Sequence, residues 1–539
     1  MGVSPPCIPK QGSGTLYAAY EARLQALQKR GQSHCLRSCR VGLEKESLRV
    51  NPDGSIAQTP HPPALGAALT HPWITTDYSE ALLEFITPPC DGGDAALGFL
   101  RDLQAFTYPR IGEEFLWATS MPCVLDGEAS IPVARYGTSN AGRMKTVYRL
   151  GLGHRYGRLM QVIAGVHFNF SMGDDFWPVY REVTGGGEDP RRFRDRVYFG
   201  MIRNLQRLGW LVPYLFGASP AVCRSFLAGR PTTLAEFDEG TYYEPHATSL
   251  RMGDIGYQNR KEEETGIKAN YNSLEAYVQS LERAIHTPSP DYQRIGVCVD
   301  GEYRQLNANI LQIENEYYST VRPKPVIQGN EKPVRALRRG GVAYVELRSL
   351  DVNAFEPMGL GRDQLHFLEA LMIFALLDDS PELDELEQLS IDHNQSATAH
   401  RGRDPGLKLL QRDGQPIPLR AWAEQVLAAM EPLCRVLDGE TPGRPYTTAL
   451  QAQRAKVADA ALTPSARMLE EMAACEEGFH LFARRVSLQH AAYFRDVALE
   501  AAREAELEAA ASRSLREQRD LEAADEPDFA EYLRRYFAQ

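Results

Sequence analysis

Residues 41–50 read VGLEKESLRV, and this stretch decides the kind of fold that the chain can have. Its apolar and polar residues alternate, and the NPDG that follows at 51–54 is a turn signal, so we expect a strand that enters a hairpin or loop. Side chains two residues apart on a strand point to the same face. Glu44 and Glu46 therefore project side by side, and two adjacent carboxylates repel each other unless a cation or a proton lies between them.

Three further strand-like segments, at 81–87, 160–171 and 341–350, also place ionisable side chains among apolar residues. Burying such a charge is costly unless it is paired or bound to a metal. If these strands share one sheet, one face of it carries an oxygen-rich set with a single imidazole, which suits Mg²⁺ or Mn²⁺ better than zinc. The predicted metal-binding set is Glu44, Glu46, Asp77, Glu84, His167 and Glu346.

Each member of this set, taken alone, has an ordinary structural explanation. A Glu pair on a strand usually faces solvent, a strand histidine is more often a satisfied core residue, and the Glu346-Leu347-Arg348 sequence is more often a cross-strand ion pair. The prediction of a shared metal site therefore depends on the recurrence of the pattern in four segments.

Basic residues gather in RMKTVYRLGLGHRYGR (143–158), although the chain as a whole is acidic. Arginine forks suit phosphate and carboxylate oxygens, and the small polar YGTSNAG (136–142) before them is typical of a loop that approaches a ligand. A solvated loop is the alternative for this stretch. Arg251, Arg322 and Lys324 are further basic points, and there is no Walker-type GxxxxGK[ST], no GxSxG and no HExxH in the chain.

The composition excludes several other classes of protein. The 539 residues carry a formal net charge of -12, which argues against nucleic-acid binding, and no apolar run approaches the length of a membrane span. Nine irregularly spaced cysteines favour reduced thiols over a disulfide framework. Residues 1–14 are rich in Pro and Gly, so we expect them to be disordered, and they lack the apolar region of a signal peptide, so we expect a cytoplasmic location. We also expect a monomer.

Helical and strand-like segments alternate without a βαβ repeat, which predicts an α+β domain on a mostly antiparallel sheet. We expect residues 15–360 to form this domain and the helical residues 361–539 to pack on it. The 500–524 stretch is predicted to be a solvated surface helix. The expected strands are 41–50, 81–87, 160–171, 305–318 and 341–350, and the expected helices before 360 are 15–30, 93–107, 192–209 and 272–286.

Several of these segments together resemble one known family. GLEKESLRV (42–50), YGTSNAGRMKTVYR (136–149), GVHFNFS (165–171), PYLFGASPAVC (213–223) and YVELRSLDVNAF (344–355) occur in the order and with the gaps of the bacterial, single-polypeptide glutamate–cysteine ligases. The resemblance extends from about residue 40 to about residue 380. It implies a fold like the catalytic domain of glutamine synthetase, with an antiparallel sheet bent into a funnel around the active site.

The resemblance also implies roles for individual residues. Mg²⁺ would be held by the six residues of the predicted metal-binding set, and Arg348, beside the catalytic Glu346, would lie near the transferred phosphoryl group. We assign Arg143, Lys145 and Arg348 to ATP. Tyr78 departs from relatives that often carry Phe, and Cys35 and Cys39 are not part of the family pattern. The resemblance assigns substrate binding to Tyr78, Tyr148, Arg149, Leu152, Gln161, Arg251, Tyr257 and Tyr318.

The implied reaction joins the γ-carboxyl of L-glutamate to the amine of L-cysteine through γ-glutamyl phosphate, with ATP and Mg²⁺ (or Mn²⁺). Three alternatives stay open at this point. The chain could be an ATP-dependent ligase for another amine, a phosphotransferase that acts on a guanidino group, or a non-catalytic nucleotide-binding protein. The last would be expected to have lost some of the metal positions, and all six are present here.

Overall fold

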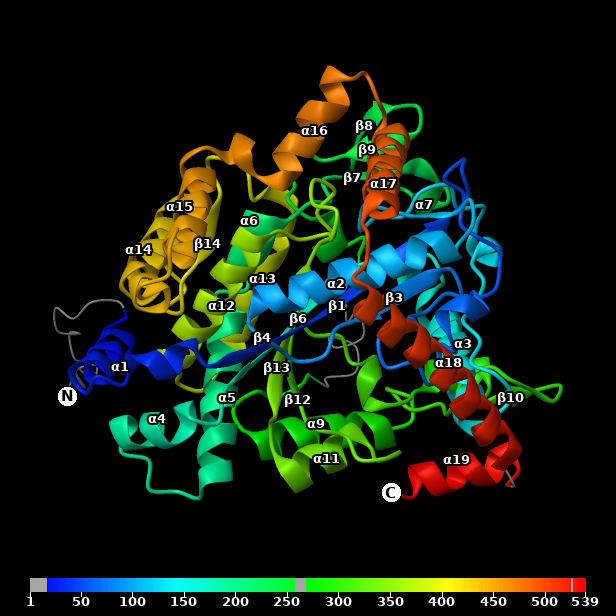
Figure 1. The fold of residues 1–539 in the computed structure, drawn as a ribbon, viewed down its shortest axis with the longest axis horizontal. Coiled ribbons are helices and arrows are strands. Elements are labelled where there is room, and N and C mark those ends of the chain that lie inside the picture. The colour runs from blue at the N-terminus through cyan, green and yellow to red at the C-terminus, as the bar shows by residue number, and fades with distance from the viewer. Residues whose placement is uncertain (1–16, 257–267, 525–526) are drawn as a thin grey trace, which may run out of the picture.

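The structure is a computed structural model that describes residues 17–256, 268–524 and 527–539 (Figure 1). The predicted disordered segment 1–14 and Tyr257 lie outside the described residues. Residues 41–50 form most of β1 (Cys39–Val50), which is the longest strand in the described part of the chain and lies in the middle of an open eight-stranded sheet. Every pairing in this sheet is antiparallel, as predicted. Its main path is β12 (Val321–Lys324), β13 (Tyr344–Leu350), β6 (Val166–Met172), β1, β3 (Leu82–Ile86) and β2 (Ile74–Thr76), and β4 (Cys90–Asp91) and β5 (Phe115–Leu116) also pair with β1.

The two faces of the sheet differ because strand side chains alternate. Val41 and Leu43 on β1, Phe168 on β6 and Leu347 on β13 point to one face and are buried. The opposite face carries Glu44 and Glu46 of β1, His167 of β6 and Glu346 of β13, while Lys45 of β1 is buried on the apolar side, where it donates to Gln104 of α2. Three helices lie over the apolar side, where they contact the strands or one another: α2 (Gly93–Thr107), α5 (Pro190–Arg207) and α12 (Arg362–Leu377).

The apolar core does not stop at residue 360. One cluster of buried side chains contains residues from Tyr20 to Leu507 and includes almost the whole of α12. The remaining helices and small strands surround this core (Figure 1). The helices are α1 (Ala18–Lys29), α3 (Asn140–Tyr156), α4 (Phe176–Thr184), α6 (Leu211–Phe216), α7 (Arg224–Leu227), α9 (Leu274–His286), α10 (Pro290–Ile295), α11 (Pro333–Gly340), α13 (Glu385–Arg401), α14 (Leu419–Asp438), α15 (Pro445–Ala458), α16 (Pro464–Ala474), α17 (Phe479–Asp496), α18 (Ala501–Ala524) and α19 (Phe529–Phe537). One small sheet has the strand order β7 (Ala221–Cys223), β9 (Thr241–Tyr243), β8 (Ala235–Asp238). Two further small sheets are the pair β10 (Cys298–Val299) and β11 (Glu302–Tyr303) and the pair β14 (Lys408–Leu410) and β15 (Pro416–Pro418).

The predicted strand at 305–318 is wrong. Side chains in this segment bond to its own backbone, which replaces the ladder that a strand would need. The backbone amide of Gln312 donates to Glu316 Oε2 (2.7 Å), and the side-chain amide of Asn307 donates to the backbone carbonyl of Gln312 (2.8 Å). The result is an irregular segment with one 3₁₀ turn, Glu314–Glu316.

Four other expectations need correction. The alternative of a solvated loop for 143–158 is wrong, because Ser139 caps the helix α3, which includes most of this stretch. The strand predicted at 160–171 begins only at Val166. Strands do not cease after 360, since β14 and β15 form a hairpin. Helix α18 is not fully solvated, because Leu507 and Ala510 are buried and the helix contacts α2.

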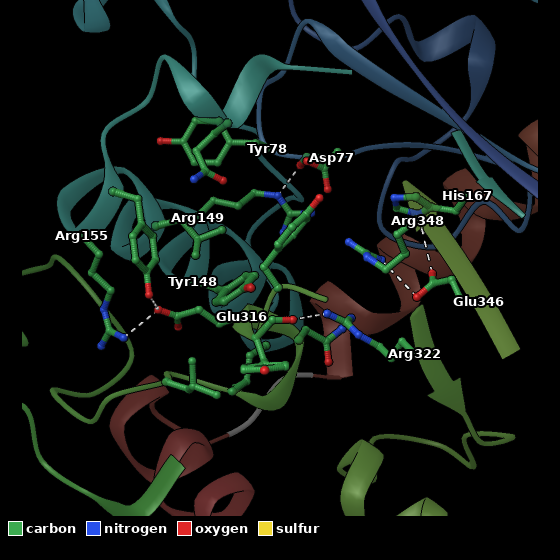
Figure 2. Close-up of a pocket in the computed structure, with 18 of the residues that line it drawn as sticks. Asp77, Tyr78, Tyr148, Arg149, Arg155, His167, Glu316, Arg322, Glu346 and Arg348 are labelled. Carbon is green, nitrogen blue, oxygen red and sulfur yellow. Dashed lines mark hydrogen bonds and ion pairs between the residues drawn. The ribbon is translucent and has the colours of Figure 1, made fainter. Parts of the chain in front are cut away.

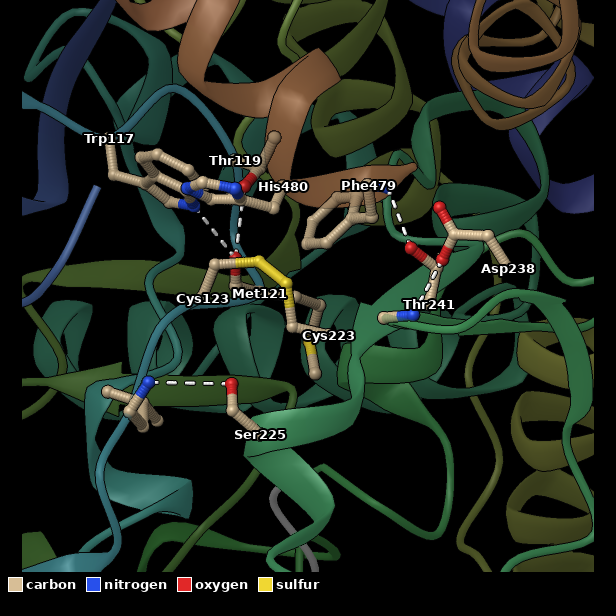
Figure 3. Close-up of a disulfide and its surroundings, with 12 residues drawn as sticks. Trp117, Thr119, Met121, Cys123, Cys223, Ser225, Asp238, Thr241, Phe479 and His480 are labelled. Atoms are coloured by element: carbon tan, nitrogen blue, oxygen red, sulfur yellow. Dashed lines mark hydrogen bonds between the residues drawn. A yellow bond between two sulfur atoms is a disulfide. The ribbon is translucent and has the colours of Figure 1, made fainter. Parts of the chain in front are cut away.

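The expectation that all cysteines are reduced is wrong for one pair. Cys123 and Cys223 form a disulfide across a sequence separation of 100, with their Cα atoms 5.4 Å apart (Figure 3). Both are buried, because the loop after β5 packs against β7 at this point. Sequence spacing could not reveal the pair, since only the tertiary fold brings the two segments together. The other cysteines among the described residues are free.

No helix in the described part of the chain is both long and apolar enough to cross a membrane.

Candidate functional site

A cavity of about 570 Å³ opens over the charged face of the sheet (Figure 2). Strands β1, β3, β6, β12 and β13 form its floor, and α3, α9 and the irregular segment 310–318 form its walls. The six residues of the predicted metal-binding set all line it.

Cross-strand register explains why the acidic residues meet. Glu46 on β1 is the register partner of Glu84 on β3, and Glu44 on β1 is the register partner of His167 on β6. Directly opposite side chains on one face of an antiparallel pair lie close together. The strand order β13, β6, β1, β3 therefore draws the separate segments of the sequence into one row, as the shared-face prediction requires.

Glu44, His167 and Glu346 each offer a ligand atom, and these atoms lie within 4.8 Å of one another. Nδ1 of His167 is 3.1 Å from Glu44 Oε2 and 3.6 Å from Glu346 Oε1. Burial, together with the nearby Arg348, lowers the pKa of His167, so the ring is neutral at pH 7 and keeps a lone pair for a cation. Two carboxylates and one neutral imidazole are a donor set that suits Mg²⁺ or Mn²⁺.

The other acids of the row are crowded. Burial and the neighbouring Asp77 raise the pKa of Glu46 to about 8. The pKa of Glu84 is raised well above its usual range by burial, by Glu44 and by Asp77. Such carboxylates ionise together only when a cation offsets their repulsion, so this crowding fits a site for divalent cations.

Positive side chains border Glu346 on its other side. Lys324 Nζ lies 3.2 Å from Glu346 Oε1. The Arg348 guanidinium lies 3.1 Å from Glu346 Oε2, and Figure 2 shows this contact. Although burial opposes the charged form, these two cations hold the pKa of Glu346 well below its usual range. The end of the cavity at β13 thus combines a fixed carboxylate with cations that suit a phosphate group.

Helix α3 provides one wall through side chains at helical spacing. Lys145, Tyr148, Arg149 and Leu152 recur every three or four residues and all line the cavity. The Arg149 guanidinium donates to the carbonyl of Asp77 and lies over the Tyr136 ring, 4.6 Å from its centroid. The helix therefore presents a fixed guanidinium beside the acidic row.

The remaining predicted substrate residues close the cavity. Tyr78, Gln161 and Arg251 are buried in its lining, and Tyr318 also lines it. The Tyr78 hydroxyl would be only 2.4 Å from a Cβ at position 153, so the glycine there allows the ring to lie against α3. Burial raises the pKa of Tyr78 to about 12, so its hydroxyl is protonated.

Arg143 is the one described residue of the predicted site that the cavity lining does not include. It is exposed, with its guanidinium 4.4 Å from the centroid of the Phe529 ring. Arg143 lies six residues before Arg149, which puts the two on different faces of α3. A helical wheel of 140–156 would have separated them, but no helix was predicted for this stretch.

The sequence analysis also missed a buried ion pair in the cavity wall. Arg155 donates to Glu316 Oε1 (2.8 Å), which also accepts from Tyr156 (2.8 Å), and all three residues line the cavity. Arg155 and Tyr156 follow Leu152 at helical spacing, so the periodicity of α3 would have predicted that they line the cavity. Glu316 lies in the segment that was wrongly predicted as a strand. The sequence analysis names Lys324 as a basic residue but does not assign it to the site. Alternation along β12 would have placed its side chain on the polar face of the sheet.

Comparison with known proteins agrees with this geometry. The family model described as glutamate-cysteine ligase matches residues 24–398. The chain belongs to the glutamate–cysteine ligase family. A glutamate–cysteine ligase of Alcanivorax borkumensis is 47% identical over 96% of this chain and 99% of its own length, and one of Pseudomonas aeruginosa is 49% identical over 93% and 95%. The predicted family and enzyme class, a ligase, are confirmed.

A solved member of the glutamate–cysteine ligase family shares the whole architecture. The crystal structure of glutamate–cysteine ligase from Francisella tularensis in complex with AMP matches with a TM-score of 0.87 at 37% identity. The match covers 93% of this chain and 98% of that one. The predicted α+β fold with a large antiparallel sheet is therefore confirmed.

Proposed function

We propose that the cavity is the active site in which this chain joins the γ-carboxyl of L-glutamate to the amine of L-cysteine, with conversion of ATP to ADP and phosphate. The observation that carries the proposal is the convergence of Glu44, His167 and Glu346 in the same cavity as Arg149 and Arg251. Family membership supports the reaction, and the AMP complex of the Francisella relative supports a nucleotide as co-substrate.

Mg²⁺ fits the donor set that the strands present. Glu44, His167 and Glu346 would hold one ion, and the crowded Glu46, Glu84 and Asp77 would hold further ions. When bound, the metal would neutralise negative charge on the triphosphate and act as a Lewis acid. Mn²⁺ offers the same preference for oxygen and imidazole ligands.

The reaction needs two anions to meet, because the glutamate γ-carboxylate attacks the γ-phosphorus of ATP. Arg348, fixed by Glu346, would stabilise the charge on the phosphoryl group as it moves. In phosphoryl transfer such electrostatic stabilisation, together with positioning, supplies most of the rate enhancement. Lys145 would contact the nucleotide. The product of this step is γ-glutamyl phosphate. The cysteine amine then attacks its acyl carbon and displaces phosphate.

Arg149 and Arg251 would bind the carboxylates of the amino acids, since both guanidinium groups reach the cavity from buried or half-buried positions. Tyr78, Tyr148, Leu152, Gln161 and Tyr318 would enclose the cysteine. Exclusion of water by these side chains protects the acyl phosphate from hydrolysis. The buried Tyr78 hydroxyl would add a polar group near the thiol, which a phenylalanine could not provide.

The test is release of phosphate from ATP in the presence of L-glutamate, with and without L-cysteine. We expect steady release only when both amino acids are present, with γ-glutamylcysteine as product. A panel of other amines decides the acceptor, and a better substrate than cysteine would favour the alternative ligase. A stable phosphorylated guanidino compound, formed without cysteine, would contradict the proposal.

A further inference from the structure

Arg251 reaches the cavity from a short 3₁₀ turn, Leu250–Met252, yet its guanidinium is held by other segments. Its Nη2 donates to the carbonyl of Arg348 (3.0 Å), and its Nη1 lies 3.7 Å from Oδ1 of Asp351. Both contacts come from the end of β13 and the residue that follows it. The strand that carries Glu346 and Arg348 therefore also determines where Arg251 points.

Asp351 is itself fixed from two further segments. Its Oδ1 accepts the hydroxyl of Ser249 (2.9 Å), and its Oδ2 accepts the backbone amide of Ala218 (2.8 Å). The side chain is fully buried, so this carboxylate cannot turn toward water. A buried carboxylate with such fixed partners gives the adjacent guanidinium a fixed counter-charge.

Gly165 bounds the guanidinium on its other side. A Cβ at this position would lie 2.1 Å from Arg251 Nη2, so any side chain would displace it. Gly165 is not among the glycines with positive φ, so space and not backbone conformation requires a glycine here. Its amide donates to Glu46 Oε2 (2.7 Å), which places this residue between a cation-binding carboxylate and Arg251.

We propose that Asp351 and Gly165 are positioning residues that hold the Arg251 guanidinium where it binds the carboxylate of an amino-acid substrate. The proposal rests on the proposed function for the role of Arg251 itself. Neither residue lines the cavity, and both act through the guanidinium. Loss of either positioning contact changes the affinity for that amino acid and leaves the phosphate half of the site in place.

The experiment measures KM for L-glutamate, L-cysteine and ATP, and kcat, in wild type and in the variants Asp351→Asn, Gly165→Ala and Arg251→Lys. We expect each of the first two variants to raise KM for one amino acid by about tenfold, a typical effect of removing a group that orients a ligand-binding residue. KM for ATP and kcat should stay within about threefold of wild type, as expected when only the binding of one substrate is lost.

Double variants show whether the effect passes through Arg251. In the Arg251→Lys background the Nη2 and Nη1 atoms are absent, so Asp351→Asn and Gly165→Ala should add little. Asp195→Asn is the matched control, because Asp195 is also a buried aspartate that accepts a backbone amide near β13, from Val342 (2.7 Å), but lies outside the cavity lining. It should leave every KM unchanged.

The proposal would be overturned if the KM increase in the Asp351→Asn/Arg251→Lys double variant equalled the product of the increases in the two single variants. Unchanged KM values in both Asp351→Asn and Gly165→Ala would also overturn it. If Asp351→Asn does not fold, Gly165→Ala decides alone, because its clash is with the end of a flexible side chain. If the wild type lacks cysteine-dependent phosphate release, only the proposed function fails. Calorimetric binding of each amino acid to the same variants then tests the positioning role of Asp351 and Gly165. A wild type that binds neither amino acid overturns both the proposed function and the positioning role.

Discussion

At the scale of single residues, position 346 concentrates the electrostatics of the site. The Glu346 side chain is fully buried and lies within ion-pair distance of Lys324, His167 and Arg348. A buried carboxylate with this many partners is costly to neutralise, because the partners lose their counter-charge at the same time. The residue therefore serves both the predicted metal site and the arginine assigned to the phosphoryl group.

Replacing this carboxylate by an amide should affect turnover much more than folding. We expect Glu346→Gln, and likewise His167→Ala, to lower kcat by on the order of 10²-fold or more, because each removes a group that stabilises charge in the transition state. Steady-state kinetics at saturating substrates and circular dichroism measure the two effects. Glu331→Gln, on a half-buried glutamate that is paired with Arg339 and lies outside the cavity lining, is the control and should keep full activity.

A buried histidine far from the reaction should make stability depend on pH. His71 accepts the backbone amides of Trp73 (3.1 Å) and Ile74 (2.8 Å) at Nδ1, which only the neutral ring can do. Burial, with Arg513 nearby, lowers its pKa to about 4. Since the unfolded value is about 6.5, the unfolded chain binds this proton first as the pH falls. Stability is thus complete above pH 6.5 and is lost between about pH 6.5 and 4, by up to about 3 kcal/mol.

Urea unfolding at a series of pH values tests this. His71→Asn keeps an acceptor oxygen without a titrating ring, so its free energy of unfolding should fall less steeply with acid than that of wild type. A residual slope is expected from His61 and His490, whose pKa values burial also lowers. His34→Asn, on an exposed histidine, should not change the slope. Identical slopes for His71→Asn and wild type would contradict the assignment.

At the scale of elements, the last helix supports the wall of the cavity. Phe529, Leu533 and Tyr536 of α19 pack with Met144 and Val147 of α3 in a small cluster of their own. Figure 1 shows α18 descending along the side of the molecule to place α19 below α3. Arg149 and Leu152 of α3 point into the cavity, and Tyr148 both lines the cavity and packs against this cluster. The C-terminal helix thus supports the wall that carries the α3 side chains proposed to bind substrate.

Loosening this cluster should weaken substrate binding selectively. We expect Phe529→Ala, which removes a large apolar side chain, to raise KM for the amino acid bound at Arg149 by roughly tenfold, because α3 loses one of its supports. Mg²⁺ dependence and KM for ATP should change little. Leu521→Ala on α18, where the leucine is largely exposed, is the control. Equal KM values in wild type and Phe529→Ala would show that α3 needs no support from α19.

At the scale of the whole molecule, distant parts of the chain are tied together in two ways. The main core joins residues on both sides of position 360, and the disulfide joins Cys123 to Cys223. Around the disulfide, Trp117 donates to the carbonyl of Met121 (3.0 Å), and Phe479 and His480 of α17 lie against the same loop (Figure 3). Ser120 of this loop accepts the amide of Val352 at its hydroxyl (2.8 Å), which connects the loop to the end of β13.

The disulfide should contribute measurably to stability. Disulfides typically stabilise a fold by roughly 2–4 kcal/mol, and the loss of chain entropy for a loop of this length gives an upper figure of about 4.7 kcal/mol. We expect Cys123→Ser, and wild type treated with dithiothreitol, to unfold at the same lower urea concentration. The variant should not respond to the reductant. Cys475→Ser, on an exposed free cysteine, is the control, and a reductant-insensitive wild type would show that the bond does not form in solution.

Metal binding should also stabilise the whole molecule. A ligand that binds only the folded state adds stability with concentration, by about 2.7 kcal/mol at a hundred times its dissociation constant. We expect Mg²⁺ to raise the thermal midpoint of wild type and EDTA to reverse the rise. Glu44→Gln should show a smaller response. An equal response in that variant would remove Glu44 from the predicted metal-binding set.

The sequence by itself determined which face of each strand is polar. Strand alternation is a local property, so it put Glu44 and Glu46 on one face of their strand and predicted a shared face with Glu84, His167 and Glu346 on the condition that the strands belong to one sheet. The family resemblance supplied most of the substrate residues. Only the tertiary structure decided the strand order that makes Glu44 and His167 neighbours, and the packing that turns Arg149 inward and Arg143 outward. The Cys123–Cys223 bond and the irregular 305–318 segment were also decided there, because both depend on contacts between or within segments that no local periodicity encodes.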